Sequence, residues 1–209
     1  MAWNDEREKL RAELCTLLMR VSAIKFGTFT LAGGKLSPYY VDLRVVPSFP
    51  DAYRVTCGAF SETITHDVGL ARFNRISGIP TAGIPFASVV AFQMKKPFLY
   101  VRKDVKTHGR ERMVEGILLP GDKVLVLDDL ITTGGSLINA AKAIRAEGGV
   151  VNDAVVLIDR EEGGKEALAK AGIRLHSLTR MSEVAKILLK TGTLSPDQYK
   201  SIAKQIRAG

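Results

Sequence analysis

The run from Val124 to Ser136, VLVLDDLITTGGS, constrains the fold more than any other stretch of the chain. Its first four residues are apolar and predict a short buried strand, which ends at the adjacent carboxylates Asp128 and Asp129. The polar residues that follow lead into an apolar-periodic segment, residues 137–146, that predicts a helix. A strand, a loop and a helix start in this order are typical of α/β proteins with a parallel sheet.

The loop within this run has the chemistry of an anion site. The free backbone N–H groups of a first helical turn, together with the positive end of the helix dipole, bind anions. Gly134 and Gly135 allow the backbone to approach a ligand, and the hydroxyls of Thr132, Thr133 and Ser136 add hydrogen bonds. The adjacent carboxylates suit sugar hydroxyls or a hydrated Mg²⁺. Either pair alone indicates only a polar loop, whereas the whole run predicts a phosphorylated ribose as ligand.

The run resembles, over its full length, the phosphoribosyl-pyrophosphate (PRPP) motif of the type I phosphoribosyltransferases. The resemblance implies that the two carboxylates hold the ribose hydroxyls and that the loop binds the 5′-phosphate. It also implies Mg²⁺ as cofactor, carried by PRPP and reached through water by the carboxylates, with no direct protein ligand. The residues that it assigns to PRPP in this run are Asp128, Asp129, Leu130, Ile131, Thr132, Thr133, Gly134, Gly135 and Ser136.

Residues 25–44 carry a second signature. Their β-forming residues alternate around a Gly-Gly turn and predict a hairpin. The pattern KFGTFTLAGGKLSPYY is similar to the amino-terminal signature of the orotate phosphoribosyltransferases, which narrows the resemblance to that family. The resemblance places Lys25 at PRPP and places Tyr39 and Tyr40 against the orotate ring. Without it, the tyrosines would indicate only packing within a strand.

A strongly basic segment lies between Lys95 and Arg112, with seven bases and two acids in a chain whose net charge is +8. Alone, such a run predicts a solvated surface loop, and it lacks the interleaved aromatic residues of a nucleic-acid site. The pattern RKDVKTHG is similar to the mobile catalytic loop of the orotate phosphoribosyltransferases. The resemblance implies that residues 102–116 close over the active site of the neighbouring subunit in a homodimer. It assigns the grip on pyrophosphate to Arg102, Lys103, Lys106 and His108, which with Asp128 and Asp129 are the expected catalytic residues.

Two further positions complete the expected site. Asp159-Arg160-Glu161 follows a predicted strand over residues 150–157, and such a run commonly forms surface ion pairs. By resemblance, Arg160 instead meets the carboxylate of orotate, which a guanidinium binds bidentately. Thr132 is also assigned to orotate. Thr81-Ala82 departs from the Tyr-Lys pair that many bacterial relatives carry in the loop that contacts pyrophosphate.

Strands alternate with helices from Phe73 to Leu178, which predicts a mainly parallel five-stranded sheet flanked by helices, with the ligand at the carboxyl ends of the strands. The resemblances imply that this is the type I phosphoribosyltransferase fold. We expect one domain over residues 1–209. Its expected parts are an amino-terminal helix (5–24) and hood hairpin up to about residue 45, a core over 46–180 with a helix capped by Ser48, and two closing helices over 181–209 that pack on the hood.

Composition limits the partners. A hydrophobic content of 46% without an apolar run of membrane length indicates a soluble protein with no membrane partner. The first residues lack the apolar core of a signal peptide, so we expect a cytoplasmic location, and Cys15 and Cys57 fall at apolar helical positions as free buried thiols. The net positive charge predicts an anionic partner.

Together, the resemblances imply transfer of ribose 5-phosphate from PRPP to orotate, giving orotidine 5′-monophosphate and pyrophosphate for the synthesis of UMP. One alternative is a phosphoribosyltransferase for another base, such as a purine, although Arg160 and the tyrosine pair disfavour it. The other is a regulator that keeps the fold and the PRPP site but binds nucleic acid, which the intact loop cations disfavour.

Overall fold

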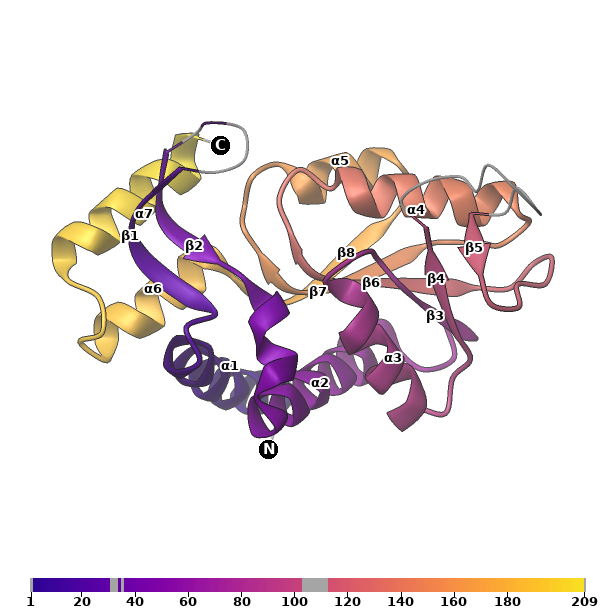
Figure 1. Ribbon diagram of the computed structural model, residues 1–209, viewed down its shortest axis with the longest axis horizontal. Helices are drawn as coiled ribbons and strands as arrows, with labels where there is room; N and C mark the ends of the chain where they lie inside the picture. The colour runs from indigo at the N-terminus through magenta and orange to yellow at the C-terminus, as the bar shows by residue number, and fades with distance from the viewer. Residues whose placement is uncertain (1, 31–33, 35, 103–112, 209) are drawn as a thin grey trace.

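The computed structural model describes residues 2–30, 34, 36–102 and 113–208. At its centre lies a six-stranded sheet with the strand order β5-β4-β3-β6-β7-β8 (Figure 1). Five of these strands run parallel, which confirms the predicted mainly parallel sheet. The strands are β3 (Arg75–Gly78), β4 (Phe98–Val101), β5 (Val114–Glu115), β6 (Val124–Ile131), β7 (Asp153–Asp159) and β8 (Arg174–Arg180).

The strand beyond the expected five is β5, at the edge of the sheet. It pairs antiparallel with β4, with Tyr100 opposite Glu115 and Val101 opposite Val114. A strand of two residues carries no period in its side chains, so the sequence contains no signal for it.

The order of the strands defines where a ligand can bind. From β3 the chain moves outward to β4, and it then returns to the other side of β3 to form β6. The direction of winding therefore reverses between β3 and β6. At such a switch point the loops after the two strands diverge to opposite faces of the sheet and leave a crevice at the carboxyl ends.

Helices cover both faces of the sheet (Figure 1). In β6, Leu125 and Leu127 are buried in one apolar cluster with Phe86, whereas Val124 and Val126 are buried in another with Ile144. Helices α2 and α3 thus lie on one face, and α4 and α5 lie on the other. The helices are α1 (Trp3–Arg20), α2 (Pro50–Thr63), α3 (Gly83–Gln93), α4 (Gly135–Ala146), α5 (Gly164–Lys170), α6 (Met181–Lys190) and α7 (Pro196–Ala208), with a 3₁₀ helix η1 (Leu43–Ser48) and a π-helical turn η2 (Ile64–Val68).

The hood consists of the hairpin β1 (Ile24–Thr30) and β2 (Leu36–Val41) with α6 and α7 (Figure 1). The hairpin strands are antiparallel, and Ile202 of α7 is buried in the same cluster as Val41 of β2. Ser195 and Gln198 exchange hydrogen bonds of 2.9 and 3.2 Å at the start of α7, which is a capping box. The expected packing on the hairpin is found for α7, which lies against β2, whereas α6 packs on α7 and α1.

Several expected boundaries were wrong. Helix α1 ends at Arg20 because Ile24 already pairs with Val41 in the hairpin. Ser48 does not cap α2, which follows Phe49 and has no side-chain cap. Strand β6 runs on to Ile131, because its pairing with β7 continues past the apolar residues.

Two further features concern the cysteines and the length of the helices. Both cysteines are buried and free, as expected. None of the helices in the described part of the chain is long and apolar enough to cross a membrane.

Candidate active site

A pocket of about 330 Å³ lies at the carboxyl ends of β3 and β6, at the switch point of the sheet. The loop after β3 forms one wall, and the segment from the end of β6 into α4 forms the other. The lining residues are Pro80, Thr81, Ala82, Asp128, Asp129, Leu130, Ile131, Thr132, Thr133, Gly134, Gly135, Ser136 and Leu137. All nine residues of the run that are assigned to PRPP, 128–136, therefore meet in one cavity. The peptide bond between Pro80 and Thr81 is cis.

The loop between β6 and α4 depends on a glycine. Gly134 has φ +83°, a left-handed conformation that side chains with a Cβ rarely adopt. A Cβ at this position would also lie 2.6 Å from Cδ1 of Leu168 in α5. Helix α4 begins at Gly135 directly behind it, so the free N–H groups of its first turn border the pocket. This wall can bind a phosphate.

Asp128 and Asp129 lie in the last part of β6 and also border the pocket. The backbone N–H of Asp129 donates to Oδ1 of Asp128 over 2.9 Å, and that of Leu130 donates to Oδ1 of Asp129 over 2.9 Å. Helix α3 begins against this strand at Gly83, where a Cβ would lie 2.8 Å from Oδ1 of Asp128. The close packing of α3 holds the first carboxylate in place.

Burial disfavours the charged form of both carboxyl groups. It raises the pKa of Asp128 well above its usual value, and the neighbouring charge of Asp129 raises it further. Burial also raises the pKa of Asp129. Within residues 2–30, 34, 36–102 and 113–208, no basic side chain forms an ion pair with either group. A cation or a set of hydroxyl donors would therefore satisfy both carboxylates.

Arg160 joins the core to the hood. Its backbone N–H donates to the carbonyl oxygen of Ile131 over 3.0 Å, which places it beside β6. Its guanidinium carbon lies 5.0 Å from the centre of the Tyr39 ring, and its Nη2 lies 2.8 Å from Oε1 of Glu162. Burial raises the pKa of Tyr39, although the charge of Arg160 opposes this shift. The predicted Tyr39 and Arg160 are thus in contact, and both are buried.

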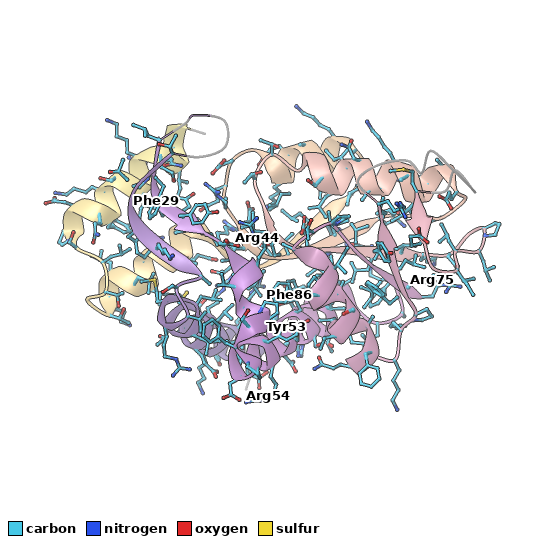
Figure 2. All side chains as sticks on the ribbon, viewed as in Figure 1. Phe29, Arg44, Tyr53, Arg54, Arg75 and Phe86 are labelled. Atoms are coloured by element: carbon cyan, nitrogen blue, oxygen red, sulfur yellow. The ribbon has the colours of Figure 1, made fainter. Side chains whose placement is uncertain are left out.

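The other predicted hood residues lie on the same hairpin. Lys25 is exposed on β1 and is paired in register with Tyr40 on β2. Arg44 donates to both carboxylate oxygens of Asp42, over 2.6 and 2.9 Å, and lies 3.3 Å from the hydroxyl of Tyr40. Figure 2 shows Arg44 at the junction of hood and core.

Arg102 ends the described part of the basic segment. It follows β4, and its Nη1 lies 2.9 Å from Oε1 of Glu115. It lines a second pocket of about 180 Å³ that shares Pro80 and Ser136 with the first. The predicted Lys103, Lys106 and His108 lie outside the described residues.

Comparison with known proteins gives consistent matches. The phosphoribosyl transferase domain family matches residues 74–176. An orotate phosphoribosyltransferase of Cenarchaeum symbiosum is 44% identical over 185 residues, which is 88% of this chain and 92% of that protein. The chain belongs to the orotate phosphoribosyltransferases. The predicted family resemblance is therefore confirmed.

Solved structures of orotate phosphoribosyltransferases agree with this assignment. The enzyme from Aeropyrum pernix has 36% identity and a TM-score of 0.76, with 87% of this chain and 99% of that chain covered. The enzyme from Mycobacterium tuberculosis, in complex with PRPP, has 27% identity and a TM-score of 0.67, with 84% and 98% covered. The type I phosphoribosyltransferase fold is thus shared.

In this orotate phosphoribosyltransferase, sequence reasoning missed two charged residues near the site. Glu162, rather than Glu161, is the ion-pair partner of Arg160. Arg44 is bound to Asp42 where the hood meets the core, within electrostatic range of Asp129. Glu162 stands in the same Asp-Arg-Glu-Glu run as Arg160, but the sequence alone does not show which acid turns toward the guanidinium.

Proposed function

We propose that the pocket between β3 and β6 binds PRPP and transfers its ribose 5-phosphate to orotate, giving orotidine 5′-monophosphate and pyrophosphate. A nitrogen of orotate forms a bond to the anomeric carbon as the bond from that carbon to a pyrophosphate oxygen breaks, and the proton of that nitrogen passes to solvent. The observation that carries the proposal is that residues 128–136, the nine residues of the PRPP-like run that are assigned to PRPP, line one cavity at the switch point.

The wall of this cavity suggests how PRPP is held. The 5′-phosphate binds at the start of α4, where free N–H groups and the hydroxyls of Thr132, Thr133 and Ser136 converge. Asp128 and Asp129 accept hydrogen bonds from the ribose hydroxyls. Pyrophosphate lies toward the loop over residues 80–82, whose backbone supplies contacts in place of the absent Tyr-Lys pair.

The cofactor in this proposal is Mg²⁺, and the carboxylates fit it. Two adjacent acidic groups with raised pKa values are suited to a hydrated divalent cation, which favours their charged forms. Asp128 and Asp129 hold it through water, with the remaining contacts from PRPP. When bound, Mg²⁺ neutralises charge on the pyrophosphate that leaves.

Orotate is bound at the junction of hood and core. Arg160 supplies the cation for its carboxylate, Tyr39 supports the guanidinium from the hood, and Tyr40 and Thr132 border the base. Because uracil lacks the carboxylate, it leaves this guanidinium without a substrate partner and is rejected.

The remaining cations are proposed to come from the basic segment. Arg102, Lys103, Lys106 and His108 stabilise the charge that develops on pyrophosphate, and Lys25 contacts PRPP from the hood. We propose that residues 102–116 reach the site of a second subunit in a homodimer. In this proposal residues 1–209 form one catalytic domain that acts in the cytoplasm.

The direct test is the loss of orotate absorbance when the purified protein meets PRPP and Mg²⁺, beside parallel reactions with uracil, hypoxanthine and adenine. We expect turnover of orotate alone. Turnover of a purine instead would assign another base, and PRPP binding without any turnover would favour the regulator.

A further inference from the structure

The guanidinium of Arg160 is held in an unusual environment. Its side chain is only 7% exposed, and its partner Glu162 is 16% exposed. The two side chains approach to 2.8 Å between Nη2 and Oε1, while the ring of Tyr39 covers the guanidinium from the hood. Burial of a charged pair in this way costs free energy unless hydrogen bonds accompany it.

Several of those hydrogen bonds are missing. Across the described part of the chain, Nε and Nη2 of Arg160 and Oε1 of Glu162 are buried without a hydrogen-bond partner. The close contact therefore neutralises charge but is poorly aligned for hydrogen bonding. A buried donor without an acceptor is costly, so the guanidinium has donors that a ligand carboxylate can satisfy.

The neighbouring acid, Glu161, makes different contacts. Glu161 has φ +61° and accepts hydrogen bonds from the backbone N–H and the hydroxyl of Ser182, over 2.8 and 3.1 Å. This turns Glu161 toward α6 and leaves Glu162 as the acid beside Arg160. The two glutamates are adjacent in sequence and equal in charge, yet only one of them faces the proposed base site.

We propose that Glu162 is a positioning and specificity residue that occupies the place of the substrate carboxylate in the free protein. This inference rests on the proposed binding of orotate at Arg160. Glu162 holds the guanidinium beside Tyr39, and it gives up that contact when orotate supplies a better aligned carboxylate. A neutral base cannot displace an anion from the guanidinium, so the ion pair excludes bases without an acidic group.

The charge of Glu162 also opposes orotate, because two carboxylates then share one guanidinium. Glu162→Gln removes that charge and keeps an oxygen that can accept from Arg160. We expect the KM for orotate to fall by about 5-fold, a change that a small electrostatic difference produces, with kcat and the KM for PRPP changed by less. Glu162→Asp retains the charge, but its shorter side chain places the charge farther from the guanidinium. We expect a smaller fall in the KM for orotate in this variant.

The matched control is Glu161→Gln, which removes the same charge one residue away and should leave the KM for orotate unchanged. A second readout compares inhibition by an anionic pyrimidine carboxylate with inhibition by its neutral carboxamide. We expect Glu162→Gln to strengthen the first and not the second.

An unchanged or raised KM for orotate in Glu162→Gln would overturn the inference, as would equal effects on both inhibitors. If the Glu162→Gln variant does not fold, the KM for orotate of Glu162→Asp tests the inference in the same way. These results are distinct from a failure of the proposed function, in which the unaltered protein itself does not turn over orotate.

Discussion

Asp128 and Asp129 show at the scale of single residues how a site can work against folding. Asp129 is buried and Asp128 is half-buried in the wall of the pocket, and within the described residues neither has a cationic partner. Burial keeps their carboxyl groups protonated to a higher pH than in the unfolded chain, so ionisation at neutral pH lowers the free energy of unfolding. A ligand that supplies a cation or hydroxyl donors to these carboxylates offsets this loss of stability.

Asp128→Asn should therefore increase stability while it reduces activity. The unfolded carboxyl ionises near pH 4, and the folded one ionises only at higher pH, so the stability of the unaltered protein falls as pH rises through that window. We expect the variant to gain stability relative to it over the same window, as measured by urea unfolding between pH 4 and 8.

In the same variant, kcat/KM should fall by about 10- to 100-fold, which corresponds to the loss of one hydrogen bond to a charged group. The amide still accepts the hydrogen bond from the backbone of Asp129, so the local structure is retained. Equal stability of the two proteins at every pH would contradict the assignment of a raised pKa.

At the scale of elements, the pocket depends on how helices begin. Helix α3 starts at Gly83 against Asp128, and α4 starts after the left-handed Gly134, which packs on Leu168 of α5. Each close approach is made possible by a glycine. The shape of the loop between β6 and α4 is thus set by the packing of two helices on the end of one strand.

Gly134→Ala should destabilise the protein by about 1–3 kcal/mol, because it places a Cβ in a left-handed conformation and against Leu168. The matched control is Gly135→Ala, whose Cβ would meet nothing within 4 Å. We expect Gly135→Ala to unfold at the same urea concentration as the unaltered protein but to raise the KM for PRPP, because its methyl group enters the pocket. Equal destabilisation by both changes would refute this account.

The same elements show which features of the fold and the site can be predicted from the sequence. Apolar runs identified the parallel strands, and the run 128–136 identified the pocket, because both signals are contiguous. The edge strand β5 and the extension of β6 through two aspartates depend on pairing with neighbouring strands, which local patterns do not contain. The contact of Glu162 with Arg160 and the position of Arg44 depend on how hood and core meet, so they emerged only from the structure.

At the scale of the whole molecule, the proposed site combines parts from two subunits. The pocket residues come from one chain, and Lys103, Lys106 and His108 are proposed to come from another. Lys103→Ala or Lys106→Ala should then lower kcat by orders of magnitude while orotate binding is retained.

Mixed dimers test this arrangement directly. Lys103→Ala and Asp129→Asn are each expected to be nearly inactive, but a dimer with one chain of each contains one site built from two unaltered parts. Random reassociation of equal amounts makes half of the dimers mixed, so we expect about a quarter of the unaltered activity. No recovery after reassociation would place the loop over its own chain's pocket.

The contact between Tyr39 and Arg160 has a consequence for how such a protein can diversify. In the proposed site, one continuous stretch of the core binds the sugar phosphate, whereas the base is selected by residues of the hood hairpin and of the end of a neighbouring strand. Substitutions in the hood can therefore alter which acceptor is used without disturbing the group that is transferred. A chain built in this way keeps one donor while its choice of acceptor evolves separately.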